Sequence, residues 1–198
     1  MAAASFLALG DSYTIGEGVP EQGRWPVQLV AALHAQGIPV QPPRIVATTG
    51  WTTDELSAAM DGETFQPPYA LASLLIGVND QYRGRPADGY REPFHALLQR
   101  AIALTGAARR VLVVSIPDWG VTAFAEGRDR AAIGREIDAY NAIAKDAAGR
   151  EGAHWIDITG ISRDTPGDVV ADGLHPSAHQ YTRWVERILP QAKEALPR

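Results

Sequence analysis

The sequence predicts an α/β protein, specifically a three-layer α/β/α sandwich with a five-stranded parallel sheet. Five short apolar runs alternate with segments whose apolar residues recur at helical spacing. The apolar residues form continuous runs rather than alternating with polar ones, which is typical of parallel strands that helices cover on both faces. The 198 residues are 45% hydrophobic and contain no repeat or linker, so we expect one domain over residues 1–198.

Each expected strand ends at residues that break its apolar run. Gly10 and Asp11 end the first strand, and Pro117 ends the fourth. The expected strands cover residues 5–10, 44–48, 69–76, 110–116 and 154–158.

The helices are expected between these strands and after the last one. The first begins near Trp25, since Pro26 suits a first turn, and it ends at Gly37. A long helix follows the third strand; Pro93 should lie in its first turn, so it should not begin much before Gly89. Two capping boxes and one run of helical spacing indicate the others: Thr52 with Glu55, Ser177 with Gln180, and Ile133, Ile137, Tyr140 and Ile143. Loops are expected at residues 13–18, at 118–128 and before Asp172.

The composition argues against several classes of function. A net charge of −5 disfavours nucleic-acid binding, and the lack of cysteine excludes disulfides, thiolate catalysis and cysteine metal sites. Residues 13–18 contain neither Gly-x-Gly-x-x-Gly nor Gly-Lys-Ser/Thr, so nucleotide binding is not expected. No apolar run reaches transmembrane length and no signal peptide is visible. We therefore expect a cytoplasmic protein without stable membrane insertion, unless a signal has been removed.

A serine follows the first strand at the position where α/β sheets bind ligands. Ser12 comes directly after Gly10 and Asp11, hence at the carboxyl end of the strand. A serine there is a candidate nucleophile. Gly-Asp-Ser is equally an ordinary turn at a strand end, so its possible partners decide between the two interpretations.

A candidate base follows the last strand. Of the five histidines, only His175 is expected in a loop at the carboxyl edge, and Asp172 precedes it by three residues. This spacing lets the carboxylate reach Nδ1 of the imidazole, which leaves Nε2 for the serine. The structural alternative is a helix-capping loop with a surface histidine.

Two more residues at strand ends are candidate oxyanion donors. Gly50 follows the second strand and offers a backbone N–H with no side chain, whereas Asn79 follows the third and offers a carboxamide N–H. Their structural alternatives are a turn glycine and a helix N-cap.

Taken together, these motifs resemble the four sequence blocks of the SGNH (GDSL-type) hydrolases, a family of serine esterases and lipases. The motifs are Gly10-Asp11-Ser12, Gly50, Gly77-x-Asn79-Asp80 and Asp172-x-x-His175, in this order. The resemblance implies a flavodoxin-like SGNH-hydrolase fold. It implies Ser12 as nucleophile with His175 and Asp172 as its triad partners, and an oxyanion hole made of the Ser12 N–H, the Gly50 N–H and Asn79. Tyr13 stands where the family motif has leucine.

The predicted function is therefore a serine ester hydrolase that needs no metal and no cofactor. Its partner is a small-molecule ester, and the short loops leave no segment for a large lid, which favours small acyl groups. Short-chain esters, acetylated sugars, lysophospholipids and thioesters all stay open, as does the oligomeric state. Candidate pocket residues are Trp51, Tyr82, Arg83 and Trp119, with Arg85 nearby.

Two alternatives remain at this point. One is a metal-dependent phosphoesterase, because Asp11, Asn79, Asp80 and His175 supply hard oxygen ligands and one imidazole. The other is a small-molecule binding domain without catalysis, since a fold does not imply an activity. In the esterase interpretation, Asp11 and Asp80 brace the loops by hydrogen bonds.

Overall fold

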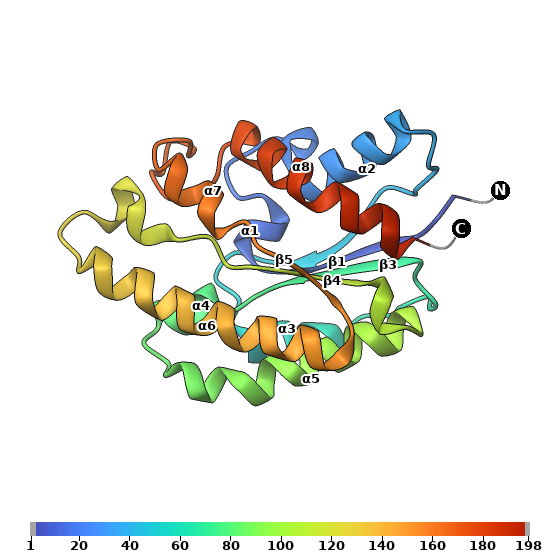
Figure 1. The fold of residues 1–198 in the computed structure, drawn as a ribbon, viewed down its shortest axis with the longest axis horizontal. Helices are drawn as coiled ribbons and strands as arrows, with labels where there is room; N and C mark the ends of the chain where they lie inside the picture. Colours follow the sequence, from blue (N-terminus) through green and yellow to red (C-terminus); the bar gives the residue numbers. More distant parts are fainter. Residues whose placement is uncertain (1–2, 197–198) are drawn as a thin grey trace.

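The computed structural model describes residues 3–196 and contains one five-stranded parallel sheet (Figure 1). Its order is β2-β1-β3-β4-β5, and every neighbouring pair is parallel. The α/β class and the five-stranded sheet expected from the sequence are confirmed; residues 1–2 and 197–198 of the expected domain lie outside the described residues. The strands are β1 (Phe6–Gly10), β2 (Arg44–Ala47), β3 (Leu71–Leu75), β4 (Val111–Val114) and β5 (His154–Ile156).

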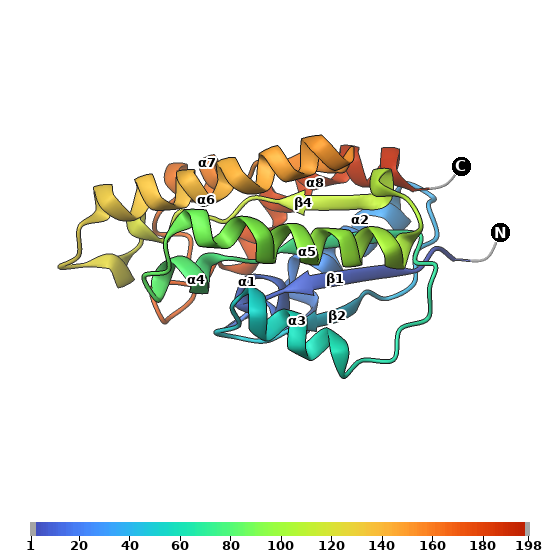
Figure 2. The same ribbon diagram turned by 90° about the horizontal axis from the view of Figure 1, so that it is seen from below.

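Helices cover both faces of the sheet. α2 (Trp25–Ala35) and α8 (Ala178–Ala195) pack together on one face. The opposite face is covered by α3 (Thr53–Asp61), α5 (Ala87–Thr105) and α6 (Arg130–Glu151) (Figures 1 and 2). Parallel neighbouring strands need crossover connections, which these helices provide. The helices on the two faces and the sheet between them make the expected three layers.

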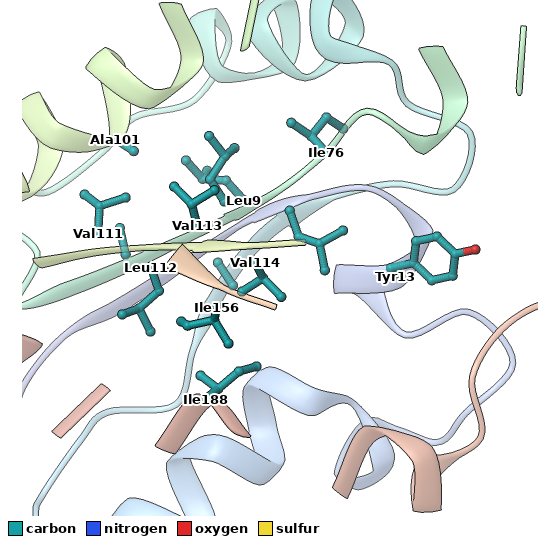
Figure 3. Close-up of a cluster of buried hydrophobic side chains, with 14 of the residues drawn as sticks. Leu9, Tyr13, Ile76, Ala101, Val111, Leu112, Val113, Val114, Ile156 and Ile188 are labelled. Carbon is teal, nitrogen blue, oxygen red and sulfur yellow. The ribbon is translucent and has the colours of Figure 1, made fainter. Parts of the chain in front are cut away.

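The core lies on both sides of the sheet. In β4, Val111 and Val113 point to the same side as Ala101 of α5, whereas Leu112 points towards Ile188 of α8 (Figure 3). All five residues are fully buried. Successive side chains of a strand point to opposite faces, so two covered faces require an unbroken apolar run.

Short helices at the carboxyl edge of the sheet were not expected from the sequence. Each is too short for its apolar spacing to show. They are α1 (Ser12–Ile15), α4 (Val78–Tyr82) and α7 (Thr159–Asp164), together with the 3-10 turns η1 (Glu21–Gly23), η3 (Trp119–Val121) and η4 (Ala123–Ala125). A further 3-10 turn, η2 (Ala108–Arg110), lies at the opposite edge, directly before β4.

β5 is also shorter than expected. It ends at Ile156, and the backbone N–H of Ile158 donates to Oγ of Ser115 at 2.8 Å instead of continuing the ladder.

The expected start of the long helix after β3 is wrong. α5 begins at Ala87, which places Pro93 in the second turn. A proline there leaves the carbonyl of Gly89 without its helical donor, but Gly89 and Pro93 are both exposed, where water can bind that carbonyl. Tyr90 holds the first turns in place, because its ring is buried and its hydroxyl donates to the Ile76 carbonyl at 2.8 Å.

Between residues 3 and 196, no helix is both long enough and apolar enough to cross a bilayer.

Candidate active site

Ser12 lies at the carboxyl end of the interior strand β1, as the first residue of α1. Asp11 caps this helix, since its Oδ1 accepts the Tyr13 N–H at 3.0 Å. A Cβ on Gly10 would lie 2.5 Å from the Leu75 carbonyl oxygen and would also collide with Thr14. Only glycine therefore allows α1 to turn back so tightly onto the strand end, and this turn holds Ser12 in a nearly buried position.

His175 and Asp172 form a pair within one turn of chain. Nδ1 of His175 lies 2.6 Å from Oδ2 of Asp172, and Oδ1 accepts the N–H groups of Leu174 and His175 at 2.8 and 3.0 Å. Partial burial raises the pKa of Asp172, but the hydrogen bonds from His175 and Leu174 lower it by more. The pKa of this carboxyl therefore lies below its usual range. The carboxylate accepts at Nδ1, which leaves Nε2 of His175 to act on a substrate or on a nucleophile.

A small hairpin holds this pair in place. The Val170 N–H donates to the His175 carbonyl at 2.8 Å, and the Ser177 N–H donates to the Asp168 carbonyl at 3.1 Å. The Asp168 carboxylate also accepts from the Ser177 hydroxyl and lies 2.7 Å from Nδ1 of His179. The loop of the candidate base is thereby attached to the N-terminus of α8.

The capping box expected at α8 is only half present. Ser177 caps the helix and accepts the Gln180 N–H at 3.1 Å, as expected. The side chain of Gln180 does not return to the cap but donates to the Asp168 carbonyl at 2.9 Å. The Asp168 carbonyl accepts from both the Ser177 N–H and the Gln180 side chain, and this partner in the hairpin replaces the local one at the cap. The box at Thr52 and Glu55 is complete.

Gly50 lies in the turn that follows β2. The Trp51 N–H donates to the Thr48 carbonyl at 3.3 Å, and Gly50 has φ +88°, a conformation that favours glycine. A Cβ at Gly50 would meet no atom within 4 Å. The backbone conformation, rather than crowding, therefore requires the glycine.

Asn79 is not the N-cap of its helix, so the structural alternative considered above is wrong. Gly77 occupies the cap position of α4, and Nδ2 of Asn79 donates to the Trp51 carbonyl at 2.9 Å. An N-cap would accept through oxygen, whereas Asn79 donates through nitrogen to the segment after Gly50.

The structure brings Ser12, Gly50, Asn79 and His175 to one cavity of about 170 Å³. Tyr82 and Trp119 line it as well. The other lining residues were not singled out from the sequence: Tyr13, Thr49, Val78, Phe124 and Leu174. Phe124 follows β4 in the segment expected to be irregular. Its 38% exposure identifies it as a candidate binding residue only once the fold is known.

Trp51 and Arg83 do not line this cavity, contrary to expectation. The Arg83 guanidinium is bound elsewhere: it pairs with Glu55 at 3.1 Å and donates to the Gly50 carbonyl at 2.7 Å. Trp51 is half-buried and packs against the hydrophobic core. Arg85 also has other partners, since it binds Asp54 at 2.6 Å and Asp80 at 3.0 Å.

Asp80 and Asp11 brace the loops. Asp80 accepts from the backbone N–H and the hydroxyl of Thr53, both at 2.9 Å. Burial raises the pKa of Asp11 to about 8; nearby Asp80 adds to the increase, while the Tyr13 N–H opposes it. Asp11 is therefore mostly protonated at neutral pH, and Asp80 is already bound to Thr53 and Arg85. Residues 3–196 contain no group of three or more histidine, aspartate or glutamate side chains arranged to hold a metal ion.

The sequence model of the GDSL-like Lipase/Acylhydrolase family matches residues 8–183. No curated protein matches the sequence. Similar solved structures include TesA, at 22% identity and a TM-score of 0.73, covering 97% of this chain and 99% of that one. The acetylxylan esterase Axe2 from Geobacillus stearothermophilus has 18% identity and a TM-score of 0.74, with 96% and 94% of the two chains covered.

A third similar structure is the psychrotrophic esterase EstA from Pseudoalteromonas sp. It has 17% identity and a TM-score of 0.73, with 96% of this chain and 97% of that chain covered. At these identities the structural similarity shows a shared fold. The match to the family model over most of the chain supports the activity. The protein is a carboxylic ester hydrolase that belongs to the GDSL-like lipase/acylhydrolase family.

Proposed function

We propose that this protein cleaves small acyl esters through an acyl-enzyme on Ser12. His175 is the general base, Asp172 orients it, and the oxyanion hole consists of the Ser12 N–H, the Gly50 N–H and Nδ2 of Asn79. The observation that carries the proposal is the cavity itself: Ser12, Gly50, Asn79 and the paired His175 all line it, although they follow four different strands.

The chemistry proceeds in two steps. Oγ of Ser12 attacks the ester carbonyl while its proton moves to Nε2 of His175, and the resulting tetrahedral intermediate expels the alcohol, which takes that proton. A water molecule then attacks the acyl-enzyme by the same route and releases the acid. Asp172 stays ionised throughout, because its hydrogen bonds hold its pKa below the usual range.

The oxyanion donors are available for this purpose. Nδ2 of Asn79 carries two hydrogens, of which the Trp51 carbonyl accepts one. Ser12 is the first residue of α1, and the first N–H groups of a helix have no partner within it. Such donors stabilise the charge that develops on the carbonyl oxygen.

The lining of the cavity suits a small, neutral acyl or alcohol group of the substrate. Three aromatic side chains pack against one another there, with ring centroids 5.5 to 6.2 Å apart: Tyr82, Trp119 and Phe124. Among residues 3–196, those that line the cavity include no aspartate, glutamate, lysine or arginine. An apolar cavity of about 150 Å³ holds a molecule of benzene, so about 170 Å³ suits a group of comparable size.

A fluorophosphonate probe tests this proposal. It should add to Ser12, and Ser12→Ala should lose both the adduct and the hydrolysis of p-nitrophenyl acetate. Ser177 is the internal control, because it also lies beside an Asp–His pair, formed by Asp168 and His179. An adduct on Ser177, or on any serine other than Ser12, would contradict the proposal.

Chelation separates this mechanism from the metal-dependent alternative. Ester hydrolysis should survive exhaustive treatment with EDTA, since no proposed step uses a metal ion. Loss of p-nitrophenyl acetate hydrolysis on chelation, with recovery on adding Mn²⁺ or Zn²⁺, would support the phosphoesterase-type site instead.

A further inference from the structure

The segment that carries Gly50 is held by hydrogen bonds on two consecutive backbone carbonyls. Nη2 of Arg83 donates to the Gly50 carbonyl at 2.7 Å, and Nδ2 of Asn79 donates to the Trp51 carbonyl at 2.9 Å. Both donors belong to the same short element, since Asn79 lies in α4 and Arg83 is its C-cap. The helix that presents Asn79 to the cavity therefore also sets the position of Gly50.

Glu55 holds the Arg83 guanidinium in turn. Its two carboxylate oxygens lie 3.2 Å from Nη1 and 3.1 Å from Nη2. The same carboxylate accepts the Thr52 N–H at 2.9 Å at the start of α3. The chain from Gly50 to Glu55 is thus bound to α4 at its first two residues and enters the capping box of α3 at its end. The Arg83–Glu55 ion pair connects these two ends. A guanidinium can bind a carboxylate and a carbonyl together because its donors form a rigid planar fork, which a lysine ammonium does not have.

Gly50 depends on backbone hydrogen bonds for its position because side-chain packing does not restrain it. It has no side chain to pack, and even a Cβ at this position would meet no atom within 4 Å. Its φ of +88° lies in the left-handed region, which mainly glycine adopts. The Arg83 and Glu55 side chains are 44% and 41% exposed, and ion pairs this exposed contribute little to folding stability. The effect of the pair is therefore expected in the orientation of the Gly50 backbone rather than in the stability of the fold.

We propose that Arg83 is a positioning residue for the oxyanion hole, which fixes the Gly50 backbone so that its N–H stays directed at the developing oxyanion. This inference rests on the role proposed above for Gly50. Arg83 does not line the cavity, so it acts through Gly50 and makes no contact with the substrate.

The test is a comparison of kcat and KM for p-nitrophenyl acetate in Arg83→Met and Arg100→Met. Arg100 is a matched control: it also ties α3 by donating to a backbone carbonyl, that of Ser57 at 2.9 Å, and by pairing with Asp61 at 2.8 Å, but it does not line the cavity. In Arg83→Met we expect kcat to fall about 10- to 100-fold with KM nearly unchanged, because a misplacement of about 1 Å can cost 10²-fold in rate. Arg100→Met should keep the wild-type kcat.

The outcomes separate the two proposals. If kcat of Arg83→Met is as close to the wild type as that of Arg100→Met, the positioning role is wrong, although Ser12 catalysis stands. If the wild type forms no adduct on Ser12, the proposed function itself fails.

Should Arg83→Met fail to fold, Glu55→Gln takes its place. The glutamine keeps an oxygen for the Thr52 N–H but removes the charge that orients the guanidinium. A smaller fall in kcat at unchanged KM is expected, and an unchanged kcat would overturn the inference.

Discussion

Nδ2 of Asn79 donates a hydrogen bond to the backbone carbonyl of Trp51 at 2.9 Å. This contact joins the segment after β2 to the helix after β3, two strands that lie on either side of β1. The ends of β2 and β3 are level with the end of β1, since Gly10 pairs with both Ala47 and Leu75. Both candidate oxyanion donors are thereby placed next to Ser12.

Replacing Asn79 by aspartate should greatly reduce activity. Asn79→Asp keeps the size of the side chain but removes the donor and places a carboxylate at the oxyanion site. Loss of one such donor costs about 10²–10³ in kcat, or roughly 2.7–4 kcal/mol. The Trp51 carbonyl also loses its partner, so the free energy of unfolding should fall by about 1–3 kcal/mol. Steady-state kinetics and thermal unfolding measure the two effects, and near-normal kcat in the folded variant would return Asn79 to a structural role.

Asp172→Asn should lower kcat by up to about 10⁴-fold, because an amide in place of the carboxylate favours the wrong histidine tautomer. Asp168→Asn is the matched control: Asp168 lies 2.7 Å from Nδ1 of His179 on the same hairpin, outside the cavity lining. Its kcat should fall far less. Equal losses in kcat for the two variants would mean that Asp172 acts only through the stability of the hairpin.

Asp11 should make the protein less stable as the pH rises. Its pKa is raised from 3.8 to about 8 in the folded protein by burial, with Asp80 adding to the effect. The folded state therefore holds a proton that the unfolded state releases, so the contribution of Asp11 to stability is fully present below pH 3.8 and is lost progressively as the pH rises to about 8.

Asp11→Asn should remove this pH dependence, because asparagine keeps the oxygen that accepts the Tyr13 N–H but carries no ionisable proton. Each unit of pKa corresponds to about 1.4 kcal/mol, so urea unfolding at pH 5 and pH 9 should resolve the change. Parallel stability curves for the variant and the wild type would contradict a protonated Asp11.

Phe124→Ala should weaken binding of aromatic esters. Phe124 contributes to the aromatic wall of the cavity, where an aromatic contact is worth about 0.5–1.5 kcal/mol, or roughly 2- to 10-fold in KM. The KM for phenyl acetate should rise more than that for ethyl acetate. Phe65→Ala is the control, because Phe65 packs beneath Arg44 much as Phe124 packs beneath Arg128, but it does not line the cavity. A KM for phenyl acetate that Phe124→Ala leaves unchanged would argue against binding at this wall.

The sequence by itself determined the sheet and the edge at which the site lies. Strands covered on both faces are apolar at nearly every position, so runs such as Val111–Val114 are visible without a structure. Parallel strands end at one edge, which predicts that the residues following them meet there. The Asp172–His175 pair was also predictable, because it needs only a local turn of three residues.

Only the tertiary structure decided the partners of these residues. The contact of Asn79 with the Trp51 carbonyl, and that of Arg83 with the Gly50 carbonyl, join segments about 30 residues apart in the sequence. The raised pKa of Asp11 depends on burial by the surrounding elements, and the place of Phe124 on the cavity wall depends on how its loop folds over α4. Each of these depends on which side chains meet across the sheet edge, and apolar periodicity carries no information about such contacts because it reports only which face of an element is covered.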